Sequence, residues 1–118
     1  MAKYEAAVLC GMDELVTYVE LCLGSGRAPA VLRESSELRC GGLRCCIRVY
    51  ERFDFPSLEQ AAVSLIFVED GSRVHVTAIA TGQQSCFGRE NNLKNYSEPY
   101  FIALIMGLVA KYQLQEAG

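Results

Sequence analysis

Residues 61–80, AAVSLIFVEDGSRVHVTAIA, decide the fold of this chain. Apolar and polar side chains alternate on both sides of Asp70-Gly71, a period that is typical of two β-strands joined by a tight turn. A turn at these two residues pairs Glu69 with Ser72. The register then places an apolar set on one core face: Ala61, Val63, Leu65, Phe67, Val74, Val76, Ala78 and Ala80. The reverse face is semi-apolar: Ala62, Ser64, Ile66, Val68, Arg73, His75, Thr77 and Ile79.

A second predicted hairpin precedes this one, in residues 31–52, VLRESSELRCGGLRCCIRVYER. Its turn at Gly41-Gly42 pairs Cys40 with Leu43. Counted outward, a mostly apolar face pairs Leu38 with Cys45, Ser36 with Ile47, Glu34 with Val49 and Leu32 with Glu51. The other face is basic and pairs Arg39 with Arg44, Glu37 with Cys46, Ser35 with Arg48, Arg33 with Tyr50 and Val31 with Arg52. A link from Pro56 to Glu59 makes the four strands a meander.

One strand and two helices flank the meander. Residues 3–10 alternate as in a strand, and residues 12–23 carry apolar side chains at helical spacing before Gly24. Residues 100–112 predict a second helix that is apolar nearly all round, and no period is visible from Gly82 to Tyr96. The order strand, helix, four strands, helix predicts an α+β fold with a mainly antiparallel sheet and both helices on its core face. The same order matches the topology of TATA-binding-protein-like folds.

Composition limits the class of protein. The 118 residues (13.0 kDa) are 51% hydrophobic and 21% charged, which fits a single domain over residues 1–118. A net charge of −3 argues against non-specific coating of nucleic acid. The start of the sequence lacks a signal-peptide pattern, and the apolar run from Phe101 to Ala110 is about half a membrane span, so we expect a cytoplasmic protein without membrane contact. Six cysteines without paired spacing and a single histidine indicate reduced thiols, no metal site and no cofactor.

Three stretches resemble a family of small bacterial cytoplasmic proteins to which no activity is assigned. They are MAKYE at residues 1–5, LRCCIRVYER at residues 43–52 and AIATG at residues 78–82. The resemblance extends along most of the chain. It supports the fold and implies no catalytic residue.

Two groups of charged residues are candidate sites. The basic face gathers five arginines and a tyrosine: Arg33, Arg39, Arg44, Arg48, Arg52 and Tyr50. Guanidinium groups at this spacing suit an anionic ligand or a nucleic acid, although a solvated outer face or a subunit contact has the same pattern. The apolar face holds two carboxylates, Glu34 and Glu51, about 5–8 Å apart. Such a pair lines a pocket if the face is buried, and otherwise a bulge or an overhanging hairpin exposes it.

The sequence favours a binding or assembly module over an enzyme. Cys86 is the thiol most accessible in the predicted loop, but nothing brings it to His75, so we identify no catalytic residues. The leading interpretation is a homo-oligomer, most simply a dimer, that uses the last helix and the reverse face of the hairpin at residues 61–80. The alternative is an anion or nucleic-acid binder that uses the arginine face, with nucleic acid the less favoured ligand.

Overall fold

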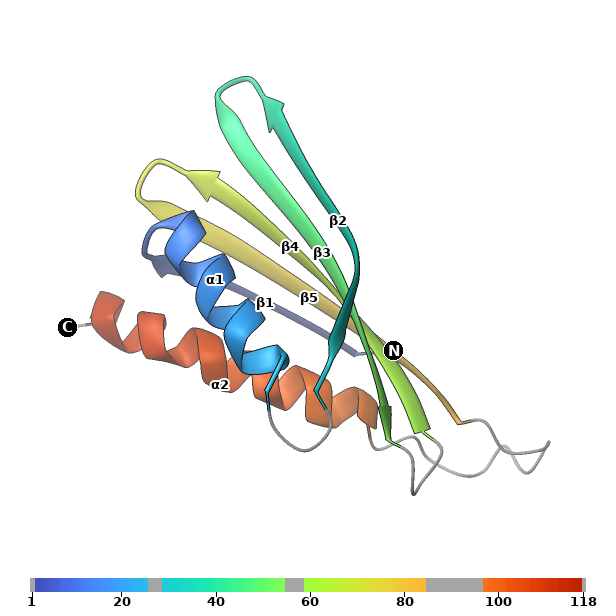
Figure 1. Ribbon diagram of the computed structural model, residues 1–118. Coiled ribbons are helices and arrows are strands. Elements are labelled where there is room, and N and C mark those ends of the chain that lie inside the picture. Colours follow the sequence, from blue (N-terminus) through green and yellow to red (C-terminus); the bar gives the residue numbers. More distant parts are fainter. Residues whose placement is uncertain (1, 26–28, 55–58, 85–96, 118) are drawn as a thin grey trace.

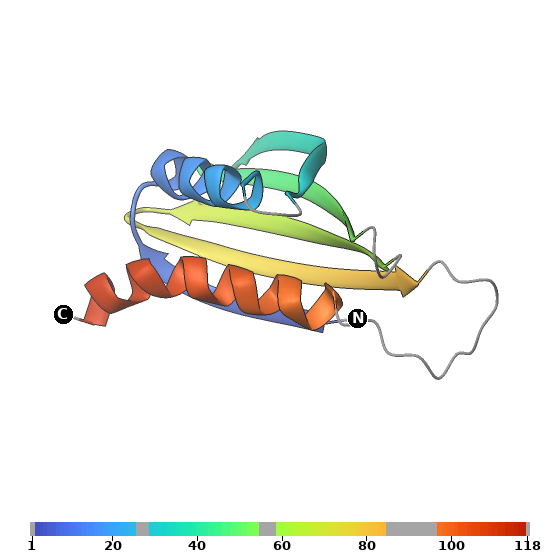
Figure 2. The same cartoon turned by 60° about the horizontal axis from the view of Figure 1, so that its bottom comes forward.

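The computed structural model describes residues 2–25, 29–54, 59–84 and 97–117. The elements follow in the order β1 (Ala2–Leu9), α1 (Met12–Leu23), β2 (Val31–Cys40), β3 (Leu43–Asp54), β4 (Glu59–Asp70), β5 (Arg73–Gln84) and α2 (Ser97–Ala117). Five antiparallel strands form one sheet in the order β1-β5-β4-β3-β2, and both helices lie on one face of it (Figure 1, Figure 2). The predicted α+β class with an antiparallel sheet is confirmed. Glu59, the last residue of the predicted link, begins β4, whereas residues 56–58 of the link and residues 85–96 of the predicted loop lie outside the described part of the chain.

The β4–β5 hairpin has the predicted faces but a different register. Its turn residues are Gly71 and Ser72, so that Asp70 pairs with Arg73 and Phe67 with Val76. Gly71 has a φ of 65°, a conformation that favours glycine at the first turn position. The predicted pairs are therefore wrong by two residues. An even shift leaves every side chain on its face, and the predicted core set is buried throughout.

The β2–β3 hairpin turns as predicted but contains a bulge. Gly41 and Gly42 have φ angles of 57° and 90°, as a two-residue turn requires, and the predicted pairs hold from Cys40–Leu43 to Glu34–Val49. Between Leu32 and Glu34 the register shifts, so that Leu32 pairs with Tyr50 and Val31 with Glu51. The three outermost predicted pairs are wrong, because the bulge adds one residue to β2.

The pairing of β3 with β4 decides which side of the first hairpin faces the helices. Cys46 lies opposite Phe67 and Tyr50 opposite Val63, and all four side chains are buried. The basic face of the hairpin is therefore on the helix side, and its mostly apolar face is on the open side of the sheet. The interpretation that the apolar face points into the core is wrong. The pattern of the hairpin fits the sheet with either side turned toward the helices, so the sequence of the hairpin alone does not decide between them. Strand β2 is exposed along its whole length.

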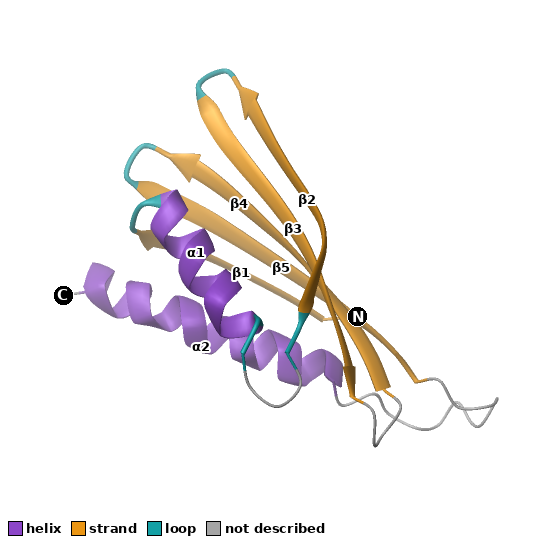
Figure 3. Cartoon of the chain, viewed as in Figure 1, coloured by secondary structure: helices purple, strands orange, loops and turns teal. Residues whose placement is uncertain are grey.

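The core lies between the helix side of the sheet and the two helices (Figure 3). Helix α1 buries one stripe at helical spacing: Met12, Leu15, Val16, Val19 and Leu23. Helix α2 does the same with Ile102, Ile105, Leu108, Val109 and Tyr112. The outer side of α2 carries exposed Ala103, Met106 and Gly107, so the large apolar excess predicted for this helix is mostly absent from its described side chains. Within the described residues, neither helix is long and apolar enough to cross a membrane.

Candidate functional site

The five arginines of the predicted basic face lie on two sides of the sheet. The register places Arg39, Arg44, Arg48 and Arg52 on the helix side. Arg33 is the bulged residue, and its Nε donates a hydrogen bond of 2.8 Å to Oε1 of Glu51, which the register assigns to the open side. A single face of five arginines is therefore wrong. Tyr50 is buried, so its ring is not available to a ligand on this surface.

Arg44 and Arg48 belong to a network of ion pairs. The two terminal nitrogens of Arg44 donate to Asp13 at 2.6 and 3.3 Å, and Asp13 is in the first turn of α1. Glu37 lies 3.8 Å from Arg44 and 3.6 Å from Arg48. The hydrogen bond from Arg44 lowers the pKa of the Asp13 carboxyl below its ordinary value. Arg44 thus connects β3 to α1, Arg48 connects β3 to β2 through Glu37, and both arginines have acidic partners.

Glu34 and Glu51 share the open side of the sheet, and both are exposed. Glu34 is opposite Val49, so the two carboxylates are diagonal neighbours across the strands, as predicted. Of the two predicted alternatives, burial and exposure, the structure shows exposure, since no helix packs on this side in the described residues (Figure 2). Glu51 forms its ion pair with Arg33 instead.

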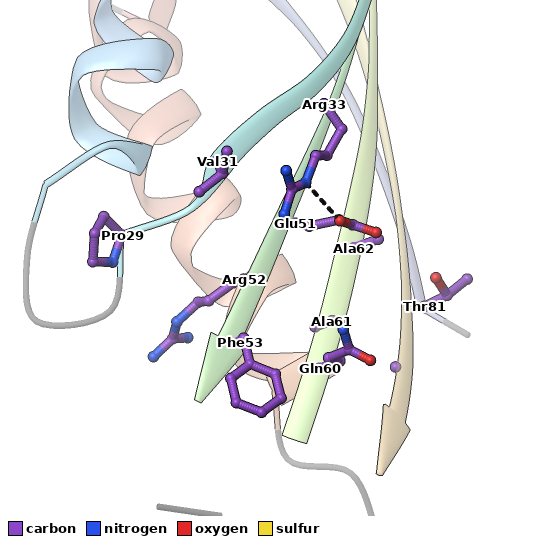
Figure 4. Close-up of a pocket in the computed structure, with 11 residues that line it drawn as sticks. Pro29, Val31, Arg33, Glu51, Arg52, Phe53, Gln60, Ala61, Ala62 and Thr81 are labelled. Atoms are coloured by element: carbon purple, nitrogen blue, oxygen red, sulfur yellow. Dashed lines mark hydrogen bonds and ion pairs between the residues drawn. The ribbon is translucent and has the colours of Figure 1, made fainter. Parts of the chain in front are cut away.

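A pocket of about 490 Å³ adjoins this ion pair, near the end of β3 and the start of β4 (Figure 4). Arg33 and Glu51 border it, and Ala61, Ala62 and Gly82 contribute small side chains or none. Its larger lining groups include Val31, Arg52, Phe53, Gln60 and Thr81. Of the two carboxylates that the sequence assigned to a pocket, Glu51 lines this one and Glu34 does not.

The second feature is the open face, which we define as the side of the sheet opposite both helices. Three of its side chains are aligned across neighbouring strands, since Ile47 pairs with Ile66 and Ile66 with Thr77. Around them lie further partly exposed residues: Cys45, Val49, Ala62, Ser64, Val68 and Ile79. Leu38 and Leu43 extend this surface and are 54% and 41% exposed. The sequence predicted the apolar side of each hairpin separately. It did not predict that the two sides form one surface, because the pairing of β3 with β4 joins residues of different hairpins.

The thiols do not form a reactive centre in the described residues. All five described cysteines are free: Cys10, Cys22, Cys40, Cys45 and Cys46. Burial, and secondarily Glu14, raises the pKa of Cys10 to about 11. Burial also raises the pKa of Cys46. Cys86 is outside the described residues, and among those described no group of three or more His, Cys, Asp or Glu side chains could hold a metal ion.

Fold and site together define a small α+β protein with an antiparallel sheet, helices on one face and an apolar surface on the other. The chain belongs to a family of unknown function, DUF6054, whose profile matches residues 1–113. The resemblance to a family without assigned activity is thereby confirmed. No curated protein and no solved structure matches the chain significantly.

Proposed function

We propose that this protein is a non-catalytic assembly module in which two copies pack their open faces together. The carrying observation is a group of partly exposed apolar side chains, among them Ile47, Ile66 and Ile79, on the side of the sheet that neither helix covers (Figure 2). Apolar surface left in water costs about 25 cal/mol per Å². A second copy of the same chain removes this surface from water with the simplest symmetry, a twofold axis.

The size of the open face suits a stable dimer. Strands are about 4.8 Å apart and rise about 3.3 Å per residue, so a five-stranded sheet of this length presents roughly 700 Å². Specific interfaces bury about 800 Å² on each partner. Sheet-on-sheet packing at about 10 Å therefore gives an interface of ordinary size, with Ile47, Ile66 and Ile79 near its centre.

The open face is complementary to itself about an axis along β4, the middle strand of the sheet. One row of paired residues runs Glu34–Val49–Ser64–Ile79–Lys3 from β2 to β1. Rotation about β4 reverses this row, so that Val49 of one copy faces Ile79 of the other. The same rotation sets Glu34 opposite Lys3, which adds an attraction at each edge.

Two observations favour this proposal over the other interpretations. Acidic partners compensate Arg44 and Arg48, and Arg33 lies on the other side of the sheet. Both findings weaken the case for one anion or nucleic-acid surface built from the five arginines. A raised pKa keeps the Cys10 and Cys46 thiols protonated at neutral pH, where they are poor nucleophiles. TATA-binding-protein-like topology, bacterial origin and a cytoplasmic location remain predictions.

Sedimentation of the protein at micromolar concentration tests the assembly. We expect a dimer of twice 13.0 kDa for the wild type. Ile66→Lys places a charge at the centre of the open face and should give a folded monomer with an unchanged far-ultraviolet circular dichroism spectrum.

Leu21→Lys is the matched control. Leu21 is a large apolar residue on α1 and is 68% exposed, away from the open face. The Leu21→Lys variant should remain a dimer. A monomeric wild type, or a dimer that tolerates Ile66→Lys as well as Leu21→Lys, contradicts the proposal.

A further inference from the structure

The pocket beside the Arg33–Glu51 ion pair has the dimensions of a small-molecule site. Its volume of about 490 Å³ is within the range of roughly 300–1,000 Å³ found for such sites. Ala62 borders the pocket on the open side of the sheet with a side chain of one carbon, so a larger side chain there would reduce the space (Figure 4). The pocket lies on the same side of the sheet as the open face and shares Ala62 with it, so it must be tested on a monomer as well as on the wild type.

Arg33 gives the pocket a group that can hold an anion. It borders the pocket on the open side of the sheet, next to Glu51. Glu51 engages Arg33 through Nε, and among the described residues no hydrogen bond or ion pair involves the two terminal nitrogens of Arg33. That outer edge of a guanidinium group matches the two oxygens of a carboxylate. Glu51 thus fixes the orientation of Arg33 and leaves its bidentate edge available.

The remaining walls suit an apolar body on the same ligand. Val31 and Phe53 border the pocket and are 48% and 44% exposed, unusually high values for large apolar side chains. The Thr81 hydroxyl adds a polar group on the β5 side. The pocket is thus lined by polar and apolar groups together, as a ligand with a charged end and an apolar body requires.

We propose that this pocket binds a small organic acid, with its carboxylate on Arg33 and its apolar body against Val31 and Phe53. Amide NMR titration with benzoate tests the proposal, with benzamide as the neutral analogue. Benzoate should give saturable shifts at Val31, Ala62 and Thr81, and benzamide should bind at least about tenfold more weakly.

Two arginine variants separate the site from general charge attraction. Arg33→Gln should weaken benzoate binding about tenfold, whereas Arg39→Gln on the same exposed strand removes an equal charge and should leave binding unchanged. Ala62→Leu should abolish binding by filling the pocket without altering charge. Circular dichroism verifies that each variant is folded.

Absence of saturable shifts, equal effects of the two arginine variants, or full binding to Ala62→Leu would overturn the proposal. Repeating the titration on Ile66→Lys keeps the two proposals separate. Benzoate binding by that variant supports the pocket whether or not the wild type is a dimer, and a folded Ile66→Lys monomer that does not bind benzoate removes the pocket proposal alone.

Discussion

Asp13 connects the first turn of α1 to the sheet through Arg44. The pairing is bidentate, with distances of 2.6 and 3.3 Å, and it lowers the pKa of the carboxyl. A carboxylate at a helix N-terminus also interacts favourably with the helix dipole. Asp13 is 81% exposed, so solvent screening limits the contribution of this pair to stability.

Asp13→Asn should lower the free energy of unfolding slightly at neutral pH and flatten its dependence on acid pH. Because the folded-state pKa is below the unfolded one, the wild-type pair stabilises the fold above about pH 4 and loses this effect as pH falls through the folded pKa. Urea unfolding at several pH values measures both effects. Glu14→Gln is the control, because it removes a charge from the same turn. An equal acid-pH change in both variants would contradict the role of Arg44.

Predictions from the sequence succeeded at the residue level where burial determines the pattern. The core positions from Ala61 to Ala80 follow from alternation alone, since one face of β4 and β5 is fully buried. The positions and partners of the arginines could not be predicted from alternation. Arg33 changes side through a bulge, and Arg44 depends on Asp13, which is 31 residues away in the sequence.

At the scale of single elements, the turn residues predicted where each hairpin turns more reliably than they predicted which residues pair. Gly41-Gly42 fixed its turn because both residues need positive φ, whereas Asp70-Gly71-Ser72 offers two overlapping two-residue turns. The structure uses Gly71-Ser72, which shifts the register by two. Helix α1 was predicted at its observed bounds because its apolar stripe and terminal glycine agree.

Strand β2 shows how an exposed edge is kept from pairing with other chains. All ten residues are exposed, and charged side chains alternate along it at Arg33, Glu34, Glu37 and Arg39. Charges and bulges on edge strands discourage edge-to-edge association. Strand β2 is therefore a poor surface for self-association, and the proposed dimer uses the open face instead.

Two glycines should respond to alanine in opposite directions. Gly42→Ala imposes a φ of 90° on a residue with a Cβ atom and should lower the free energy of unfolding by more than about 1 kcal/mol. Gly107 lies within α2, where an added Cβ atom meets nothing within 4 Å. Gly107→Ala should therefore raise the free energy of unfolding by about 0.5–1 kcal/mol. Urea unfolding measures both values. A loss of stability in both variants would contradict the assignment of Gly107 to an unhindered helix position.

At the scale of the whole molecule, the sequence predicted which elements form and failed to predict how the two hairpins join. Each hairpin alone permits either face to turn inward, and only the β3–β4 pairing removes that freedom. Because Cys46 and Tyr50 enter the core, Ile47 and Val49 are placed on the open face beside Ile66 and Ile79. The surface proposed for assembly is thus a consequence of a non-local register.

The proposed twofold axis along β4 makes a charge-reversal prediction. Lys3 and Glu34 lie at opposite ends of the same row of paired residues. Rotation about β4 places Lys3 of each copy beside Glu34 of the other copy. Lys3→Glu and Glu34→Lys should each weaken the dimer several-fold, because each places like charges together twice per dimer and one exposed pair contributes about 0.2–1 kcal/mol. The double variant should recover most of the wild-type affinity.

Sedimentation equilibrium on the four proteins measures the effect, and raised salt should reduce the differences between them. Lys3 also lies 3.8 Å from Glu5 in its own chain, so Glu5→Gln is needed to account for the loss of that contact. If the double variant dimerises no better than the single ones, the faces do not meet about β4. A dimer that nevertheless dissociates with Ile66→Lys would then require an axis perpendicular to the strands, which sets β1 against β1 and separates Lys3 from Glu34.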